Sequence, residues 1–182
     1  MKSRLKLIQV LVFSTFIIVM LVGFSFTPVT PENALKSIYP GTFIEVKNYV
    51  LSAEQQARIE KLSGVKQDSK LVSFYHVKQQ GEVRAFGYVD VHTVRTQQEA
   101  VMYVINKNAV IEEIKILSFR EPPEYLAPER WLKSFQKKSL QQNKIVLRDD
   151  VSAISGATMT ARAVTNNCRK ALAIWQVVYG EK

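Results

Sequence analysis

Four small residues stand directly before a long amphipathic segment near the end of the 182-residue chain. The four residues and the segment that follows them lie within SAISGATMTARAVTNNCRKALAIW, from Ser152 to Trp175. Its apolar residues recur at steps of three and four, which predicts a helix beginning at or just after Ser155-Gly156-Ala157. The start of a helix presents unpaired backbone N–H groups with a partial positive charge, and phosphate groups bind there. These residues therefore predict a phosphate site.

Each residue of this motif has a possible role at such a site. Gly156 and Ala157 let the backbone approach a ligand closely, and Ser155 can cap the helix or donate a hydrogen bond. Arg162, one turn beyond Thr158, can reach an anion near the Thr158 hydroxyl. The same residues also make an ordinary turn and helix cap, and the residues alone leave both interpretations open.

The composition argues against several other kinds of site. Two histidines, His76 and His92, are too few for a convincing metal site, and we expect both at the surface of strands. The single cysteine, Cys168, excludes an internal disulfide framework. No signature of a catalytic histidine, cysteine or carboxylate pair is present, so we predict no catalytic residue. Of the net charge of +9, the three basic residues Lys2, Arg4 and Lys6 lie in the first thirty residues, so the remainder carries +6, which favours anionic partners. A solvated surface with a surplus of lysine is the alternative interpretation. Basic runs with interleaved aromatic residues are lacking, so nucleic acid is not an expected partner.

The N-terminal sequence predicts a membrane anchor. Lys2, Arg4 and Lys6 precede an uncharged apolar run from Leu7 to Phe26, and about twenty residues span the hydrocarbon core as a helix. The basic flank places the start of the chain in the cytoplasm and the remainder outside. A cleaved signal peptide is the alternative. We therefore expect an anchor or signal peptide over residues 1–28 and one extracytoplasmic domain over residues 29–182.

The elements that must position the motif belong to the α+β class. Residues 31–41 are expected to form a short helix closed by Pro40-Gly41. A second helix is expected from Ser52, with Gln55 in a capping box and Gly64 at the end. A strand over residues 43–48 precedes four alternating runs between residues 70 and 119, whose short connections favour an antiparallel meander. Pro128 begins a short helix, residues 144–149 form a weak strand, and a helix over residues 158–178 packs on the sheet. The predicted architecture is an antiparallel sheet with packed helices, preceded by one N-terminal transmembrane helix.

With these elements around it, the motif resembles the FMN-binding domain family. That family includes the flavoprotein subunits of Rnf complexes and of the sodium-translocating NADH:quinone reductase, together with stand-alone relatives. The resemblance is carried by Ser155-Gly156-Ala157-Thr158, the following Met159-Thr160, the terminal helix, the meander and the N-terminal anchor. It implies that Thr158 carries FMN through a phosphodiester bond, which a flavin transferase installs from FAD. Thr160 is the rival hydroxyl, although a helical step of about 200° turns it to the opposite side.

Two departures from the family pattern bear on this expectation. The transferase target usually has an aspartate six residues before the acceptor, where this chain has Ser152, with Asp149 and Asp150 upstream. The usual Glu-Thr-Pro-Gly-type turn is replaced by the segment from Glu121 to Leu126, EPPEYL, which suggests a stand-alone branch. Glu121 and Tyr125 are then flavin-pocket candidates, and a proline-rich surface loop is the alternative interpretation.

The resemblance implies a membrane-anchored extracytoplasmic flavoprotein that carries electrons between a membrane redox partner and an acceptor. The expected partners are a flavin transferase, a membrane redox partner or quinone-linked complex, and the membrane itself. The expected location is the bacterial inner membrane, with one pass and the domain facing the periplasm or outside. An electron carrier is expected rather than a stand-alone enzyme, because a flavin supplies its own redox chemistry. The main alternative is a flavin-free binding or assembly subunit, and a third is a reductase that acts on a small extracytoplasmic substrate. The expected cofactor-binding residues are Ser155, Gly156, Ala157, Thr158, Thr160, Arg162, Glu121 and Tyr125.

Overall fold

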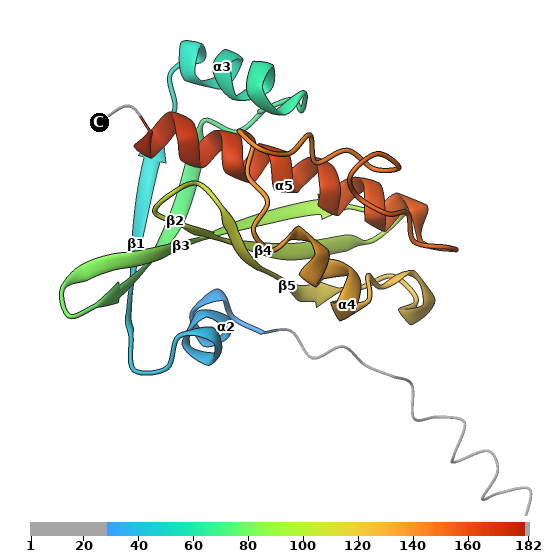
Figure 1. Cartoon of the computed structure of the whole chain (residues 1–182), viewed down its shortest axis with the longest axis horizontal. Helices are drawn as coiled ribbons and strands as arrows, with labels where there is room; N and C mark the ends of the chain where they lie inside the picture. Colours follow the sequence, from blue (N-terminus) through green and yellow to red (C-terminus); the bar gives the residue numbers. More distant parts are fainter. Residues whose placement is uncertain (1–28, 181–182) are drawn as a thin grey trace, which may run out of the picture.

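A five-stranded antiparallel sheet forms the centre of the fold (Figure 1). The structure, a computed structural model, describes residues 29–180. The strands follow one another across the sheet in chain order: β1 Phe43–Val50, β2 Leu71–Gln79, β3 Glu82–Thr93, β4 Gln98–Asn106 and β5 Ile111–Phe119. The predicted four-stranded meander is confirmed, and the strand predicted from Phe43 is its fifth member.

Helices cover both faces of this sheet, as Figure 1 shows. The α2 helix, Pro31–Ile38, packs on one face through Ala34 and Leu35. The other face carries the long α5 helix, Thr158–Tyr179, and α3, Ala53–Ser63, lies against α5. Near β5 the chain forms short turns: η1 Pro123–Tyr125, α4 Glu129–Leu132 and η2 Lys133–Phe135. The α+β class is therefore confirmed.

Local sequence signals explain where these helices begin and end. The Ser52 hydroxyl accepts the N–H of Gln55, whose side chain accepts the N–H of Ser52 in return. Gly64 ends α3 in the left-handed conformation, with φ of 67°. Pro128 precedes α4 at the N-cap position. These predictions are confirmed because each rests on a local backbone requirement that tertiary packing did not override.

The α5 helix is held against the sheet by the larger of two apolar cores. Its predicted apolar residues are buried, apart from the half-buried Val178: Ala161, Val164, Cys168, Ala171, Leu172 and Trp175. Tyr103 of β4 is fully buried, and its hydroxyl donates to the Val164 carbonyl at 3.2 Å. Arg169, on the outer side of α5, donates to the carbonyl oxygens of Ser63 and Ile145. These contacts hold α5 against the sheet and against the segments at Ser63 and Ile145.

The weak strand predicted over residues 144–149 is wrong. Ile145 and Arg148 have positive φ values of 51° and 69°, which no regular strand tolerates. The Asp150 carboxylate accepts the backbone N–H groups of Ile145 and Val146, at 3.0 and 2.7 Å. Donors that a strand would offer to a neighbour therefore serve a local turn, and the segment makes only an isolated bridge between Leu147 and Val151.

The expectation that both histidines lie at the surface is also wrong. His76 is 4% exposed, and its Nε2 lies 2.7 Å from the hydroxyl of Tyr179. His92 lies under α5, with Nδ1 2.9 Å from Asp90 and Nε2 3.1 Å from Glu99. Both side chains lie on the face of the sheet that carries α5, and strand alternation alone does not predict that this helix covers them.

Within residues 29–180, no helix combines the length and apolar character needed to cross a membrane. The anchor predicted over residues 1–28 lies outside the described part of the chain.

Candidate functional site

The predicted phosphate site is the start of α5, where no side chain of the described residues caps the helix. The helix begins at Thr158, as expected, and Ala157 occupies the N-cap position without a side-chain hydrogen bond. The suggestion that Ser155 caps the helix is therefore wrong, and Ser155 is exposed in the preceding turn. Alanine is among the poorest N-cap residues, costing about 1 kcal/mol relative to serine or aspartate. No acidic residue lies in the first turn, so its N–H groups keep their affinity for an anion.

A turn at Gly156 gives this helix start its shape. Gly156 has φ of 79°, a left-handed conformation that costs other residues about 1 kcal/mol or more. No atom lies within 4 Å of the position that a Cβ would take there. The glycine is thus required by the backbone conformation, and the space beside it stays open.

A pocket of about 320 Å³ opens directly onto this turn. Five of the predicted site residues line it: Tyr125, Gly156, Ala157, Thr158 and Thr160. Arg95 and Met159 complete the lining. The pocket therefore combines a helix start, an aromatic ring, one positive charge and a threonine hydroxyl.

The two threonines of the motif differ in what their hydroxyls do. Thr160 is 1% exposed, and its hydroxyl donates to the Tyr125 carbonyl at 2.7 Å. Thr158 is half-buried at the first position of the helix and lines the pocket. The Thr160 hydroxyl thus ties α5 to the η1 turn, whereas the Thr158 hydroxyl has no hydrogen bond to another described residue.

Three predicted site residues lie outside the pocket lining. Arg162 and Ser155 are exposed. Glu121 is 8% exposed, and its Oε1 accepts the backbone N–H groups of Arg95, Thr96 and Gln97, at 3.0, 2.6 and 2.9 Å. These bonds, above all that from Thr96, hold the pKa of Glu121 below its ordinary value. Glu121 therefore fixes the β3–β4 turn behind the pocket.

Sequence reasoning missed Arg95, although the predicted meander contained a signal for it. The start of β4 pairs with the end of β3 on one side and with the end of β5 on the other, as the pairing of Glu99 with Phe119 shows. The β3–β4 turn and the segment after β5 therefore lie at the same end of the sheet. The Arg95 guanidinium carbon lies 4.3 Å from the centre of the Tyr125 ring. A prediction of Tyr125 as a pocket residue could therefore have included the turn at Arg95.

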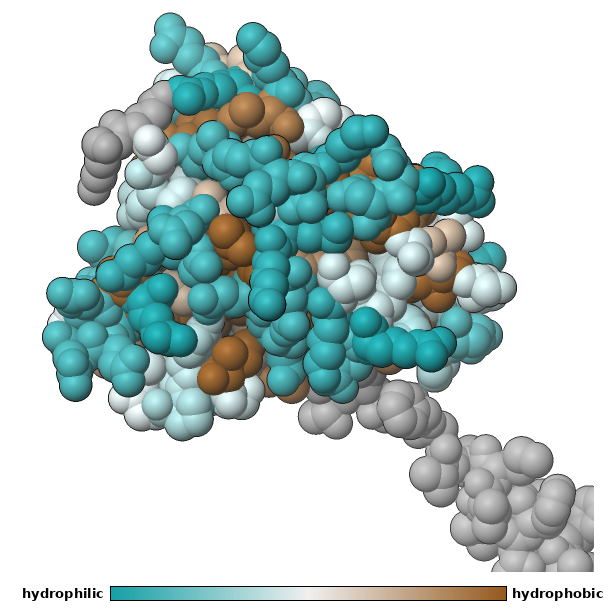
Figure 2. Space-filling model, in the orientation of Figure 1, coloured by the Kyte–Doolittle hydropathy of each residue, from teal (hydrophilic) through white to brown (hydrophobic). Residues whose placement is uncertain are grey.

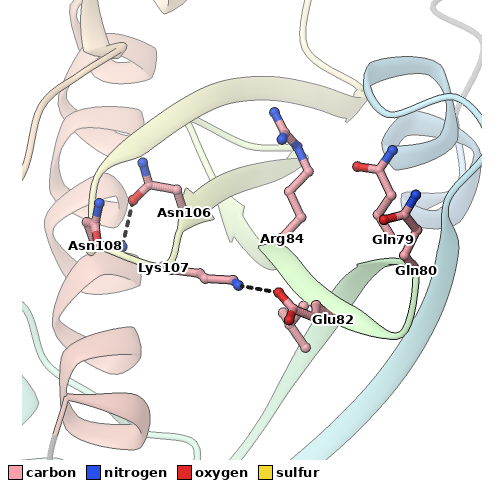
Figure 3. Close-up of a pocket in the computed structure, with 8 residues that line it drawn as sticks. Gln79, Gln80, Glu82, Arg84, Asn106, Lys107 and Asn108 are labelled. Atoms are coloured by element: carbon pink, nitrogen blue, oxygen red, sulfur yellow. Dashed lines mark hydrogen bonds and ion pairs between the residues drawn. The ribbon is translucent and has the colours of Figure 1, made fainter.

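A larger hollow of about 520 Å³ lies at the other end of the sheet, between the β2–β3 and β4–β5 turns (Figure 3). Two of its charged side chains form an ion pair, with Lys107 Nζ 3.5 Å from Glu82, and the Asn106 side chain accepts the backbone N–H of Asn108. None of its eight lining residues carries a hydroxyl or an aromatic ring. It offers neither an attachment point nor a stacking surface.

Neither a metal-binding cluster nor a reactive thiol is found among residues 29–180. No group of three or more histidine, cysteine, aspartate or glutamate side chains is arranged there to hold a metal ion. Cys168 is buried in the core, and burial raises the pKa of its thiol, which keeps it protonated and unreactive.

Comparison with known proteins agrees with the chemistry of the pocket. No curated protein matches the chain. Residues 97–173 match the family model of the FMN-binding domain. The matched part runs from the end of the β3–β4 turn through most of α5, and so contains Glu121, Tyr125 and the motif from Ser155 to Thr158. Over residues 97–173, which include these residues, the chain is therefore similar to an FMN-binding domain.

Proposed function

We propose that this protein is a membrane-anchored extracytoplasmic flavoprotein that carries FMN covalently on Thr158 and transfers electrons between a membrane redox partner and an acceptor. The observation that carries the proposal is the position of the Thr158 hydroxyl. It stands at the first residue of an uncapped helix, beside a pocket, within the part of the chain that matches the FMN-binding domain.

The residues around Thr158 suit both halves of FMN. The N–H groups of the first α5 turn favour the phosphate, and Gly156 leaves the backbone open beside it. Tyr125 and Met159 offer an aromatic ring and an apolar side chain to a flat ring system. Bound FMN would supply one- and two-electron transfer, and the chain's own residues need only hold and orient it.

The attachment step requires a flavin transferase and FAD. The Thr158 oxygen forms a bond to the FMN phosphorus of FAD as the bond between the two FAD phosphates breaks, AMP leaves, and the hydroxyl proton is released. The product is a phosphodiester with one negative charge at the start of α5, which the helix dipole stabilises. A covalent link also prevents loss of the cofactor from a domain that faces dilute solution.

The proposal is tested by co-expressing the full chain with a flavin transferase and measuring its intact mass. We expect one FMN per chain in the wild type and none in Thr158→Ala, checked by in-gel fluorescence under denaturing conditions. Thr160→Ala should keep the adduct, because its hydroxyl is already bonded to Tyr125. Thr158→Ser keeps a hydroxyl and should retain some adduct, and Ser152→Asp should raise the loaded fraction if the transferase reads that position.

Two results would contradict the proposal. Covalent FMN that persists in Thr158→Ala would place the attachment elsewhere. A wild-type chain that never acquires FMN beside an active transferase would favour a flavin-free binding or assembly subunit.

A further inference from the structure

Arg95 is the one charged side chain among the seven residues that line the Thr158 pocket. Its guanidinium carbon lies 4.3 Å from the centre of the Tyr125 ring, a cation–π contact. Among residues 29–180, no carboxylate lies within ion-pair distance of this guanidinium. In this pocket the Arg95 guanidinium therefore packs on an aromatic ring, and the N–H donors of the guanidinium remain available to a ligand.

The backbone that carries Arg95 is fixed by a nearly buried carboxylate. Glu121 Oε1 accepts the N–H groups of Arg95, Thr96 and Gln97, and the Thr96 hydroxyl lies 3.5 Å away. The Val94 N–H also donates to the Gln97 carbonyl at 3.1 Å, which closes the turn. Glu121 thus acts on the pocket through Arg95 and is a positioning residue.

The ring beneath Arg95 is tied to the helix that carries Thr158. The Tyr125 N–H donates to the Pro122 carbonyl at 3.0 Å, and the Tyr125 carbonyl accepts the Thr160 hydroxyl at 2.7 Å. The β3–β4 turn, the η1 turn and the first turn of α5 are therefore linked around one pocket. A guanidinium held in this way loses little freedom when it binds a ligand.

We propose that Arg95 binds the phosphate of FMN in this pocket and distinguishes FMN from riboflavin, which has no phosphate. This inference rests on the proposed function. A helix start contributes only partial charges, whereas the planar guanidinium supplies a full charge and paired donors that match phosphate oxygens. Arg162, the arginine expected from the sequence, is exposed and lies outside the pocket lining, and Arg95 lies just before the matched residues 97–173.

The test measures non-covalent binding of FMN and of riboflavin to the full chain purified without a transferase, by quenching of flavin fluorescence. Arg95→Gln should weaken FMN binding about ten-fold or more, the usual effect of losing a charged hydrogen bond, and leave riboflavin binding unchanged. Arg95→Lys keeps the charge without the paired donors and should give an intermediate loss. Arg120→Gln, an exposed arginine outside the pocket lining, is the matched control and should bind both flavins like the wild type.

Glu121 variants test the positioning role. Glu121→Ala should weaken FMN binding in the same direction as Arg95→Gln, and the double variant should lose little more, because both changes remove one interaction. Glu121→Gln keeps an acceptor oxygen for the three N–H groups and should restore most of the binding. If Glu121→Ala does not fold, Glu121→Gln and the Arg95 variants still decide the matter.

The outcomes separate this inference from the proposed function. Equal loss of FMN and riboflavin binding in Arg95→Gln, or no loss of either, would overturn the phosphate assignment. A loss in Arg162→Gln without one in Arg95→Gln would transfer the phosphate to Arg162. A wild-type chain that binds neither flavin and accepts no covalent FMN would instead overturn the proposed function, and this inference with it.

Discussion

His92 was expected at the surface of a strand, but it lies between two carboxylates on the face of the sheet that carries α5. Its two ring nitrogens each lie against a carboxylate, Asp90 at 2.9 Å and Glu99 at 3.1 Å, and Asn167 of α5 lies 3.0 Å from Nδ1. Lys170 of α5 pairs with the other oxygen of Asp90 at 2.6 Å. Burial by itself lowers the pKa of His92, but the hydrogen bonds to Asp90 and Glu99 outweigh it and raise the pKa to about 9. His92 is therefore an imidazolium at neutral pH.

The raised pKa predicts a loss of stability in mildly alkaline solution. Protonated His92 stabilises the folded state fully below the ordinary pKa of 6.5, and this contribution disappears as pH rises through about 9. The free energy of unfolding, measured with urea, should fall by the order of 2 kcal/mol between pH 6.5 and 9.5 in the wild type. In His92→Gln the decline over this window should be much smaller.

His76 provides the control for this measurement. Burial, helped by the nearby Lys47, lowers the pKa of His76, so it is neutral throughout the alkaline window. His76→Gln should therefore keep the decline seen in the wild type. An equal decline in His92→Gln would show that another group is responsible.

The charges around His92 could have been found in part from the sequence. In the β3–β4 hairpin His92 pairs directly with Glu99, and Asp90 lies two residues earlier on the same face. The predicted meander, together with the register of the β3–β4 hairpin, is therefore enough to place His92 beside Glu99. The contributions of Asn167 and Lys170 could not be predicted, because they depend on how α5 crosses the sheet.

At the scale of elements, the sequence predicted helix ends correctly where the type of a single residue determines the local backbone conformation. The capping box at Ser52, the end of α3 at Gly64 and the start of α5 at Thr158 agree with the structure. The prediction of a strand over residues 144–149 was wrong because it rested on β-branched composition. Composition does not reveal that the Asp150 carboxylate accepts the backbone N–H groups of Ile145 and Val146. A side chain that competes with a strand for backbone donors leaves no periodic signal.

The turn before α5 gives a prediction at this scale. Gly156 and Gly64 both have positive φ, 79° and 67°, and neither has an atom within 4 Å of the position that a Cβ would take. Replacing either by alanine should therefore cost a similar amount, about 1 kcal/mol of unfolding free energy, from backbone strain alone. Only Gly156→Ala should also slow loading of FMN by a transferase, because only Gly156 shapes the turn that carries Thr158.

Thermal unfolding and the rate of FMN incorporation measure the two effects separately. Gly64→Ala is the matched control, since it carries the same backbone strain at the end of α3, outside the pocket lining. Equal loading rates for the two variants would show that the shape of the Gly156 turn does not govern attachment.

At the scale of the whole molecule, the two ends of the sheet differ in character. The end with the β3–β4 turn carries the Thr158 pocket, and the opposite end carries the polar hollow of Figure 3. On the face shown in Figure 2, hydrophobic residues form small spots among hydrophilic ones. The pocket joins three distant segments of the chain, of which the sequence identified two, at Tyr125 and at Thr158. The third, at Arg95, depends on strand order and register.

The proposed orientation in the membrane gives the last prediction. Lys2, Arg4 and Lys6 precede the apolar run, and the positive-inside rule then places residues 29–182, with the Thr158 pocket, outside the cytoplasm. A reporter that is active only in the cytoplasm, fused after Lys182, should be silent, and one that is active only outside should be active. Replacing the three basic residues by glutamine should raise the cytoplasmic signal, because it removes the charge bias that orients the segment. A strong cytoplasmic signal from the unaltered chain would reverse the orientation and place the pocket where covalent retention of the cofactor has no clear advantage.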